Sequence, residues 1–145
     1  MSMSALSATS AFGSRRYETS HAASPALLRS LLVLGCVAAA LAAAASGEPG
    51  ALVRADPQLA FLLRGMAAIK AALVLGAIAV TLWRFGWQVP PGLAAAYIAG
   101  TSALAGASVL IWQLSFIPLA AAVFHVAAFV VLVAAWRDRG RGHAH

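Results

Sequence analysis

Long apolar runs alternate with short polar segments along this chain. Almost no charged side chains occur in the four runs, which cover about residues 26–46, 58–83, 92–112 and 116–136. A helix of about 20 apolar residues is long enough to cross a hydrocarbon core of about 30 Å. Because lipid offers no hydrogen-bond partners, each run must satisfy its own backbone groups, as a helix does. The pattern therefore predicts an all-α integral membrane protein, a four-transmembrane-helix bundle with up-down-up-down topology.

Helix-breaking residues separate the runs. Asp56 and Pro57 stand before the second run, where Asp is a good N-cap and Pro suits the first helical position. The third run follows a Pro-Pro-Gly breaker at residues 90–92. Only residues 113–115 separate it from the fourth run, which predicts a tight antiparallel hairpin. Pro118 falls in the opening turn of the fourth helix, where its missing N–H costs little.

The two ends of the chain differ from the apolar runs. Residues 1–25 are rich in Ser and Ala and carry two arginines, which predicts a disordered tail, and residues 137–145 form a second basic tail. The first run, 26–46, ends in many alanines and is weakly hydrophobic. Two alternatives stay open: a cleavable secretory signal with its cleavage site at residues 43–45, and a mitochondrial presequence, which also has a basic, Ser-rich composition.

Composition and charge place the chain in a membrane and orient it there. Of its 145 residues, 62% are hydrophobic and 10% are charged, whereas about a quarter of a soluble domain is charged. The formal net charge of +6 comes from basic residues at the ends of the runs, which is orientation charge and excludes a nucleic-acid surface. With both termini inside, the inner side carries Arg15, Arg16, Arg29, Arg84, Arg137, Arg139 and Arg141, and the outer side carries Arg54 and, at its boundary, Arg64. We therefore expect a bacterial inner membrane protein with both termini cytoplasmic.

The four tryptophans agree with this orientation. Trp83, Trp87 and Trp136 fall at the predicted inner boundary and Trp112 at the outer one. Because amphipathic indole rings prefer the interface between lipid and water, we predict that all four are interface anchors.

One lysine lies within the second run. Lys70 comes six residues after Arg64, and the run from Arg64 to Arg84 contains no acidic residue. Ionisable residues inside a membrane are candidates for a functional site, so Arg64 and Lys70 belong to a candidate polar site. The alternative is that the long lysine stem reaches outward to the headgroups.

A second polar group is expected near the middle of the hairpin. His125 lies near the midplane of the fourth helix, and Thr101 and Ser102 lie at a similar depth in the third. A hydrogen bond across the hairpin would join them and hold the helices together. A haem held by His125 would need a histidine from a second subunit, because the remaining histidines are all in the tails. The sequence predicts no cofactor and no metal site.

Small residues recur at four-residue spacing in two of the runs. The stripes are Ala68, Ala72 and Gly76 in the second run, and Ala96 with Gly100 and Ser102 with Gly106 in the third. Such stripes let helices approach closely in lipid, so we expect them at helix contacts.

These observations favour a non-enzymatic protein. No acidic residue lies between Arg64 and Arg137, and the sequence carries no phosphate-binding loop, catalytic triad pattern or paired cysteines. The first hypothesis is an accessory or scaffold subunit that packs against partner helices or forms a homo-oligomer in the lipid bilayer. The second is a small transporter or channel, perhaps homodimeric, that uses Lys70 and His125. A haem-binding membrane anchor is the third.

Overall fold

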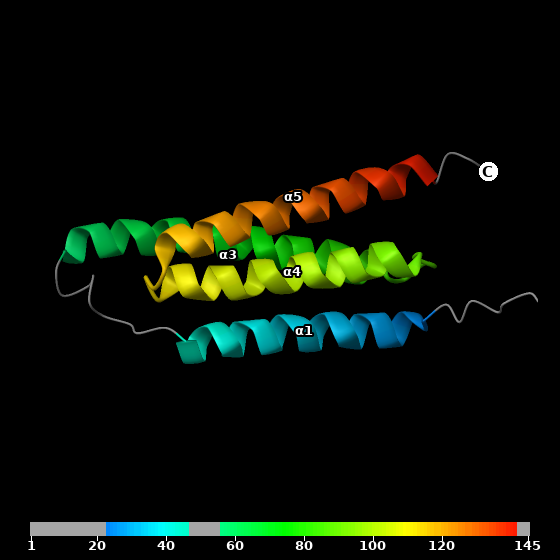
Figure 1. Ribbon diagram of the computed structural model, residues 1–145, viewed down its shortest axis with the longest axis horizontal. Helices are drawn as coiled ribbons and strands as arrows, with labels where there is room; N and C mark the ends of the chain where they lie inside the picture. The colour runs from blue at the N-terminus through cyan, green and yellow to red at the C-terminus, as the bar shows by residue number, and fades with distance from the viewer. Residues whose placement is uncertain (1–22, 47–55, 142–145) are drawn as a thin grey trace, which may run out of the picture.

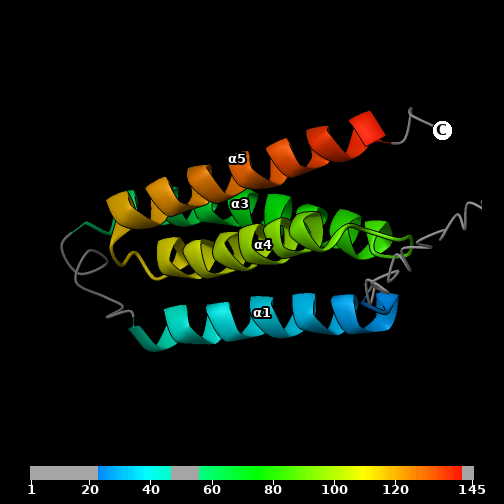
Figure 2. The same ribbon diagram turned by 45° about the vertical axis from the view of Figure 1, so that its right-hand side comes forward.

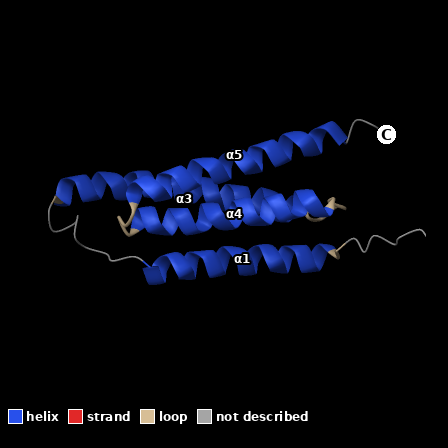
Figure 3. Cartoon of the chain, viewed as in Figure 1, coloured by secondary structure: helices blue, strands red, loops and turns tan. Residues whose placement is uncertain are grey.

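The computed structural model describes residues 23–46 and 56–141, and these residues form four helices and no strand (Figure 3). The helices are α1 (Pro25–Ser46), α3 (Pro57–Arg84), α4 (Pro91–Trp112) and α5 (Ile117–Arg141), as Figure 1 shows. All four are long and apolar enough to cross a membrane. The predicted all-helical fold is confirmed for the described residues, and so are four helices long and apolar enough to span a membrane. The four apolar helices suggest a small integral membrane protein.

The helices begin where the sequence predicts. Asp56 caps α3, because its Oδ1 accepts hydrogen bonds from the backbone N–H groups of Gln58 and Leu59 at 3.1 and 3.0 Å. Pro57 takes the first helical position, where no hydrogen bond is lost. The predicted disordered tail falls largely on residues 1–22, which lie outside the described residues.

The last helix is longer than the sequence predicted. α5 continues to Arg141, past the expected end near Trp136, so part of the predicted basic tail is helical. The extra turn carries Asp138, which pairs with Arg84 at the end of α3. The ion pair holds the last turns of α5 in place. The sequence predicted an end near Trp136 because the apolar residues stop there.

α4 is the central helix of the bundle. It packs closely against α1, α3 and α5, and it lies between α1 and α5 in both ribbon views (Figures 1 and 2). It also has the largest buried share of the four spans. The other three helices are therefore held together mainly through α4.

Small residues permit this close packing. A side chain at Gly100 would place its Cβ 2.6 Å from Cγ2 of Val131 on α5. On the opposite side, a Cβ at Gly106 would lie 3.2 Å from the carbonyl oxygen of Ala39 on α1. Close approach through small residues replaces, in lipid, the hydrophobic effect that drives packing in water. The expected role of the two stripes on the third span is thus seen at Gly100 and Gly106.

The stripe of small residues on α3 does not lie at a helix contact, although the sequence predicted that it would. Ala68, Ala72 and Gly76 are all exposed, and a Cβ at Gly76 would meet no atom within 4 Å. α3 instead packs on α4 through other positions, including the buried Ala67 and Val74. The reason is that α3 is apolar on every side, so the stripe alone did not show which side faces the bundle.

The turn between α4 and α5 is tight, as expected. Ser115 donates its backbone N–H to the carbonyl of Leu110 at 3.1 Å. Leu114 and Phe116 take positive φ angles of 60° and 48°, in the left-handed region that costs a non-glycine residue energy. The short connection imposes these angles, because the chain must reverse direction over residues 113–116.

We predict that a bulky side chain destabilises the bundle at Gly106 but not at Gly76. Gly106→Leu forces α4 away from the backbone of α1 and lowers the free energy of unfolding by about 1–3 kcal/mol, as overpacking does. Gly76→Leu enters open space and leaves the stability of the isolated chain unchanged. Thermal unfolding of purified variants in detergent measures both, and equal melting temperatures for the two variants would contradict the assignment of α4 as the central helix.

Candidate functional site

Lys70 lies against an aromatic ring of a neighbouring helix. Its Nζ is 5.2 Å from the ring centroid of Phe124 on α5, within the range of a cation–π interaction. Phe124 is buried and belongs to an apolar cluster with Val74 of α3 and Leu104 of α4. The half-buried Lys70 side chain therefore joins α3 to α5, and the interaction with the ring offsets part of the cost of a charge at this depth.

His125 points away from the other candidate residues. Its ring is exposed on the outside of the bundle, and Nδ1 donates a hydrogen bond to the carbonyl of Ala121 at 2.6 Å. Because Ala121 is one turn earlier in α5, this bond stays within a single helix. His125 also packs edge-on against Phe124, with 5.9 Å between the ring centroids. The bond expected across the hairpin is replaced by a bond inside α5.

Thr101 and Ser102 lie in two different environments on α4. Thr101 is fully buried, and its hydroxyl donates to the carbonyl of Tyr97 at 2.6 Å, one turn earlier in the same helix. Ser102 faces α1, where a Cβ at Gly35 would lie 2.6 Å from Ser102 Oγ. That oxygen is buried and has no hydrogen-bond partner among the described residues. Neither hydroxyl reaches His125, so the structure does not gather the candidate polar residues into one site.

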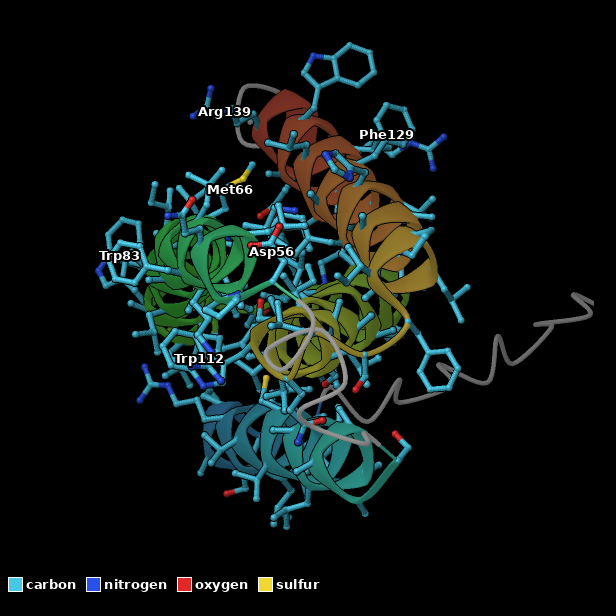
Figure 4. All side chains as sticks on the ribbon, turned by 90° about the vertical axis from the view of Figure 1, so that its left-hand side faces the viewer. Asp56, Met66, Trp83, Trp112, Phe129 and Arg139 are labelled. Atoms are coloured by element: carbon cyan, nitrogen blue, oxygen red, sulfur yellow. The ribbon has the colours of Figure 1, made fainter. Side chains whose placement is uncertain are left out.

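Arg64 and the tryptophans lie on the surface of the bundle. Arg64 is exposed near the start of α3, about 1.7 turns from Lys70, and has no ion pair within the described segments. All four tryptophans are exposed, and Trp83 and Trp87 stack edge to face with centroids 4.7 Å apart. Figure 4 shows Trp83 projecting outward from α3.

The sequence reasoning missed an ion pair between α3 and α5. Arg84 and Asp138 form a two-pronged pair: Nε donates to Oδ2, and Nη2 donates to Oδ1 at 2.7 Å. Two parallel bonds of this kind fix the geometry more firmly than a single contact. The signal in the sequence is that both residues fall at the same predicted boundary, where we counted Arg84 only as orientation charge.

A second polar contact lies at the same end of the bundle. Arg29, in the first turns of α1, donates from Nε to the carbonyl of Leu82 near the end of α3 at 3.2 Å. An arginine at the C-terminal end of a helix also complements the negative end of its dipole. Together with the Arg84–Asp138 pair, this bond ties α1 and α5 to the last turns of α3. Just beyond those turns, Phe85 is fully buried against Tyr97 of α4.

Three apolar grooves run along the bundle, and none includes the candidate polar residues. One, of about 640 Å³, lies between α4 and α5 beside Arg137, and one of about 530 Å³ lies between the starts of α1 and α4. The third, of about 380 Å³, follows α4 and α5 past Gly100 and Val126. Lys70, Thr101, Ser102 and His125 line none of these three grooves, so these grooves give no path between them.

Comparison of the chain with protein-family models, with curated proteins and with solved structures finds no match. Within residues 23–46 and 56–141, no three His, Cys, Asp or Glu side chains come together as a metal-binding group.

We predict that the ion pair between α3 and α5 stabilises the bundle. Arg84→Gln leaves the largely buried Asp138 carboxylate unpaired and lowers the free energy of unfolding by about 2 kcal/mol, between the values of exposed and buried pairs. Asp138→Asn has a similar effect, and the double variant loses less than the sum. Chemical denaturation in detergent measures the three changes. Arg64→Gln, at an exposed arginine, is the control, and strictly additive losses at Arg84 and Asp138 would rule out the pair.

Proposed function

We propose that the chain is a non-enzymatic accessory or scaffold subunit of a membrane complex, which binds a partner helix through the outer face of α3. The observation that carries this proposal is the exposed stripe of Ala68, Ala72 and Gly76. Spacing of this kind lets a second helix approach until backbones touch.

The packing of α3 supports this choice of surface. Of the four spans, α3 has the smallest buried share, although it is the longest helix. Its close packing within the bundle is with α4, which leaves the opposite face without a neighbouring helix among the described residues. The small residues of that face gain little from contact with lipid chains, whereas a helix with a complementary surface would fill the space above Gly76.

The polar residues in the spans support a structural role over a transport role. Lys70 packs on Phe124, and Thr101 and His125 each bond to a carbonyl of their own helix. A transporter that used Lys70 and His125 would need both in one aqueous path, but His125 faces the outside of the bundle. A haem between two histidines would likewise need a histidine from a partner beside His125.

The proposed setting is a bacterial inner membrane with both termini cytoplasmic. Contacts bring Arg29 and Arg84 to one end of the bundle, and the α5 arginines lie at that end beside Asp138. An excess of arginine marks the cytoplasmic side of a membrane protein. α1 takes part in this arrangement through Gly35 and Ala39, which favours a retained first span over a cleaved signal.

Site-directed photo-crosslinking tests the proposed α3 surface. In a Cys36→Ala background, a thiol-reactive photo-crosslinker is attached to Gly76→Cys, and native membranes are irradiated. We expect a discrete protein adduct, formed with either a partner subunit or a second copy of the chain, because a helix lies against this face.

The matched control is Leu132→Cys on α5, an exposed position with a large side chain suited to lipid. It should yield lipid adducts without a discrete protein band. Lipid adducts alone at Gly76→Cys would contradict the proposal.

A further inference from the structure

The groove of about 640 Å³ between α4 and α5 combines an apolar surface with one cationic side chain. Leu93 and Ala96 form its wall on α4, and Phe129, Val130 and Val133 form its wall on α5. Figure 4 shows Phe129 projecting from α5 on the side away from α3. A wall of this kind suits a hydrocarbon chain.

Arg137 lies at one end of the groove. It is exposed, and it has no hydrogen bond or ion pair among the described residues, whereas the neighbouring Asp138 is occupied by Arg84. Because Trp136 precedes it and Arg84 is at the same level, Arg137 lies where the apolar part of the bundle ends. A guanidinium there can reach an anionic headgroup while its stem follows the apolar wall.

The start of α4 adds hydrogen-bond donors to the same end of the groove. No side chain caps this helix, and Pro91 at its first position has no N–H to offer. The backbone N–H groups of Gly92 and Leu93 have no acceptor among the described residues, and both residues line the groove. Around Gly92 there is open space, since a Cβ there would meet no atom within 4 Å.

We propose that this groove binds an anionic phospholipid, with the phosphate of its headgroup at Arg137 and the first amides of α4, and one acyl chain against Phe129, Val130 and Val133. Charge complementarity selects the anionic headgroup, and the apolar walls select a lipid over a free phosphate. The proposal requires only that the helices lie in a membrane and does not depend on the scaffold role.

A neighbouring groove provides a comparison for the selectivity between lipid headgroups. The groove of about 530 Å³ on the other side of Pro90 and Pro91 has a similar apolar lining, but none of the described residues that line it is charged. Any lipid chain can occupy it, so only the groove beside Arg137 should distinguish headgroups.

Lipid titration of the purified, delipidated full-length chain in detergent tests the proposal. Dioleoyl phosphatidylglycerol should raise the melting temperature with a saturable dependence, and dioleoyl phosphatidylcholine should have a weaker effect. Arg137→Gln should raise the apparent Kd for phosphatidylglycerol about fivefold, the effect of about one charge near an anionic membrane surface. Val133→Trp, which fills the groove, should weaken binding of both lipids.

Arg64→Gln, at an exposed arginine near the opposite end of the bundle, is the matched control and should bind phosphatidylglycerol as the unmodified chain does. The proposal is overturned if Arg137→Gln binds phosphatidylglycerol with unchanged apparent Kd, or if the two lipids bind the unmodified chain equally. Because Arg137 is exposed and has no ion pair with any described residue, Arg137→Gln should keep its melting temperature in the absence of lipid. The result for Arg137→Gln therefore tests the proposal even if Val133→Trp does not fold.

Discussion

The close approach of α4 to its neighbours is the constraint on which the rest of the structure depends. A Cβ added at Gly106 would lie only 3.2 Å from a backbone oxygen of α1, and one added at Gly100 would lie 2.6 Å from a side chain of α5. In lipid, the hydrophobic effect does not draw helices together, so dispersion contacts at short range must do so. Backbones can approach this closely only where side chains are absent or small. The arrangement of α1 and α5 around α4 follows from these contacts.

The polar contacts that join different helices lie mainly at one end of the bundle. The Arg84–Asp138 pair joins α3 to α5, and Arg29 joins α1 to the last turn of α3. Towards the opposite end, Gln113 donates to the carbonyl of Ala44 at 3.2 Å, which joins α4 to α1. In the spans, the hydroxyls of Thr81, Thr101 and Ser108 bond to carbonyls of their own helices. Polar side chains thus either join neighbouring helices or bond within their own helix, which agrees with the structural role proposed above.

The sequence predicted the helices well and their contacts poorly. The sequence shows where each helix begins through the length of the apolar runs, the breaker residues and the Asp56 cap. These signals are local along the chain. No such local signal determines the rotation of each helix about its own axis. A helix that is apolar all round has no polar face to mark the outside, so Gly76 and Gly100 looked equivalent although one is exposed and the other is at a helix contact. Likewise, His125 and Thr101 were matched by depth, but depth says nothing about direction. The partner of Asp138 depended on α5 continuing beyond its apolar part.

The proposed structural role requires that the interior of this bundle is dry. Substituted-cysteine accessibility tests it most directly: in a Cys36→Ala background, Thr101→Cys, His125→Cys and Gln88→Cys are exposed in membrane vesicles to a water-soluble, membrane-impermeant maleimide from each side in turn. We predict labelling of Gln88→Cys, in the connection between α3 and α4, and none of Thr101→Cys or His125→Cys from either side. Labelling of both Thr101→Cys and His125→Cys would reveal an aqueous path through the spans and would contradict the account.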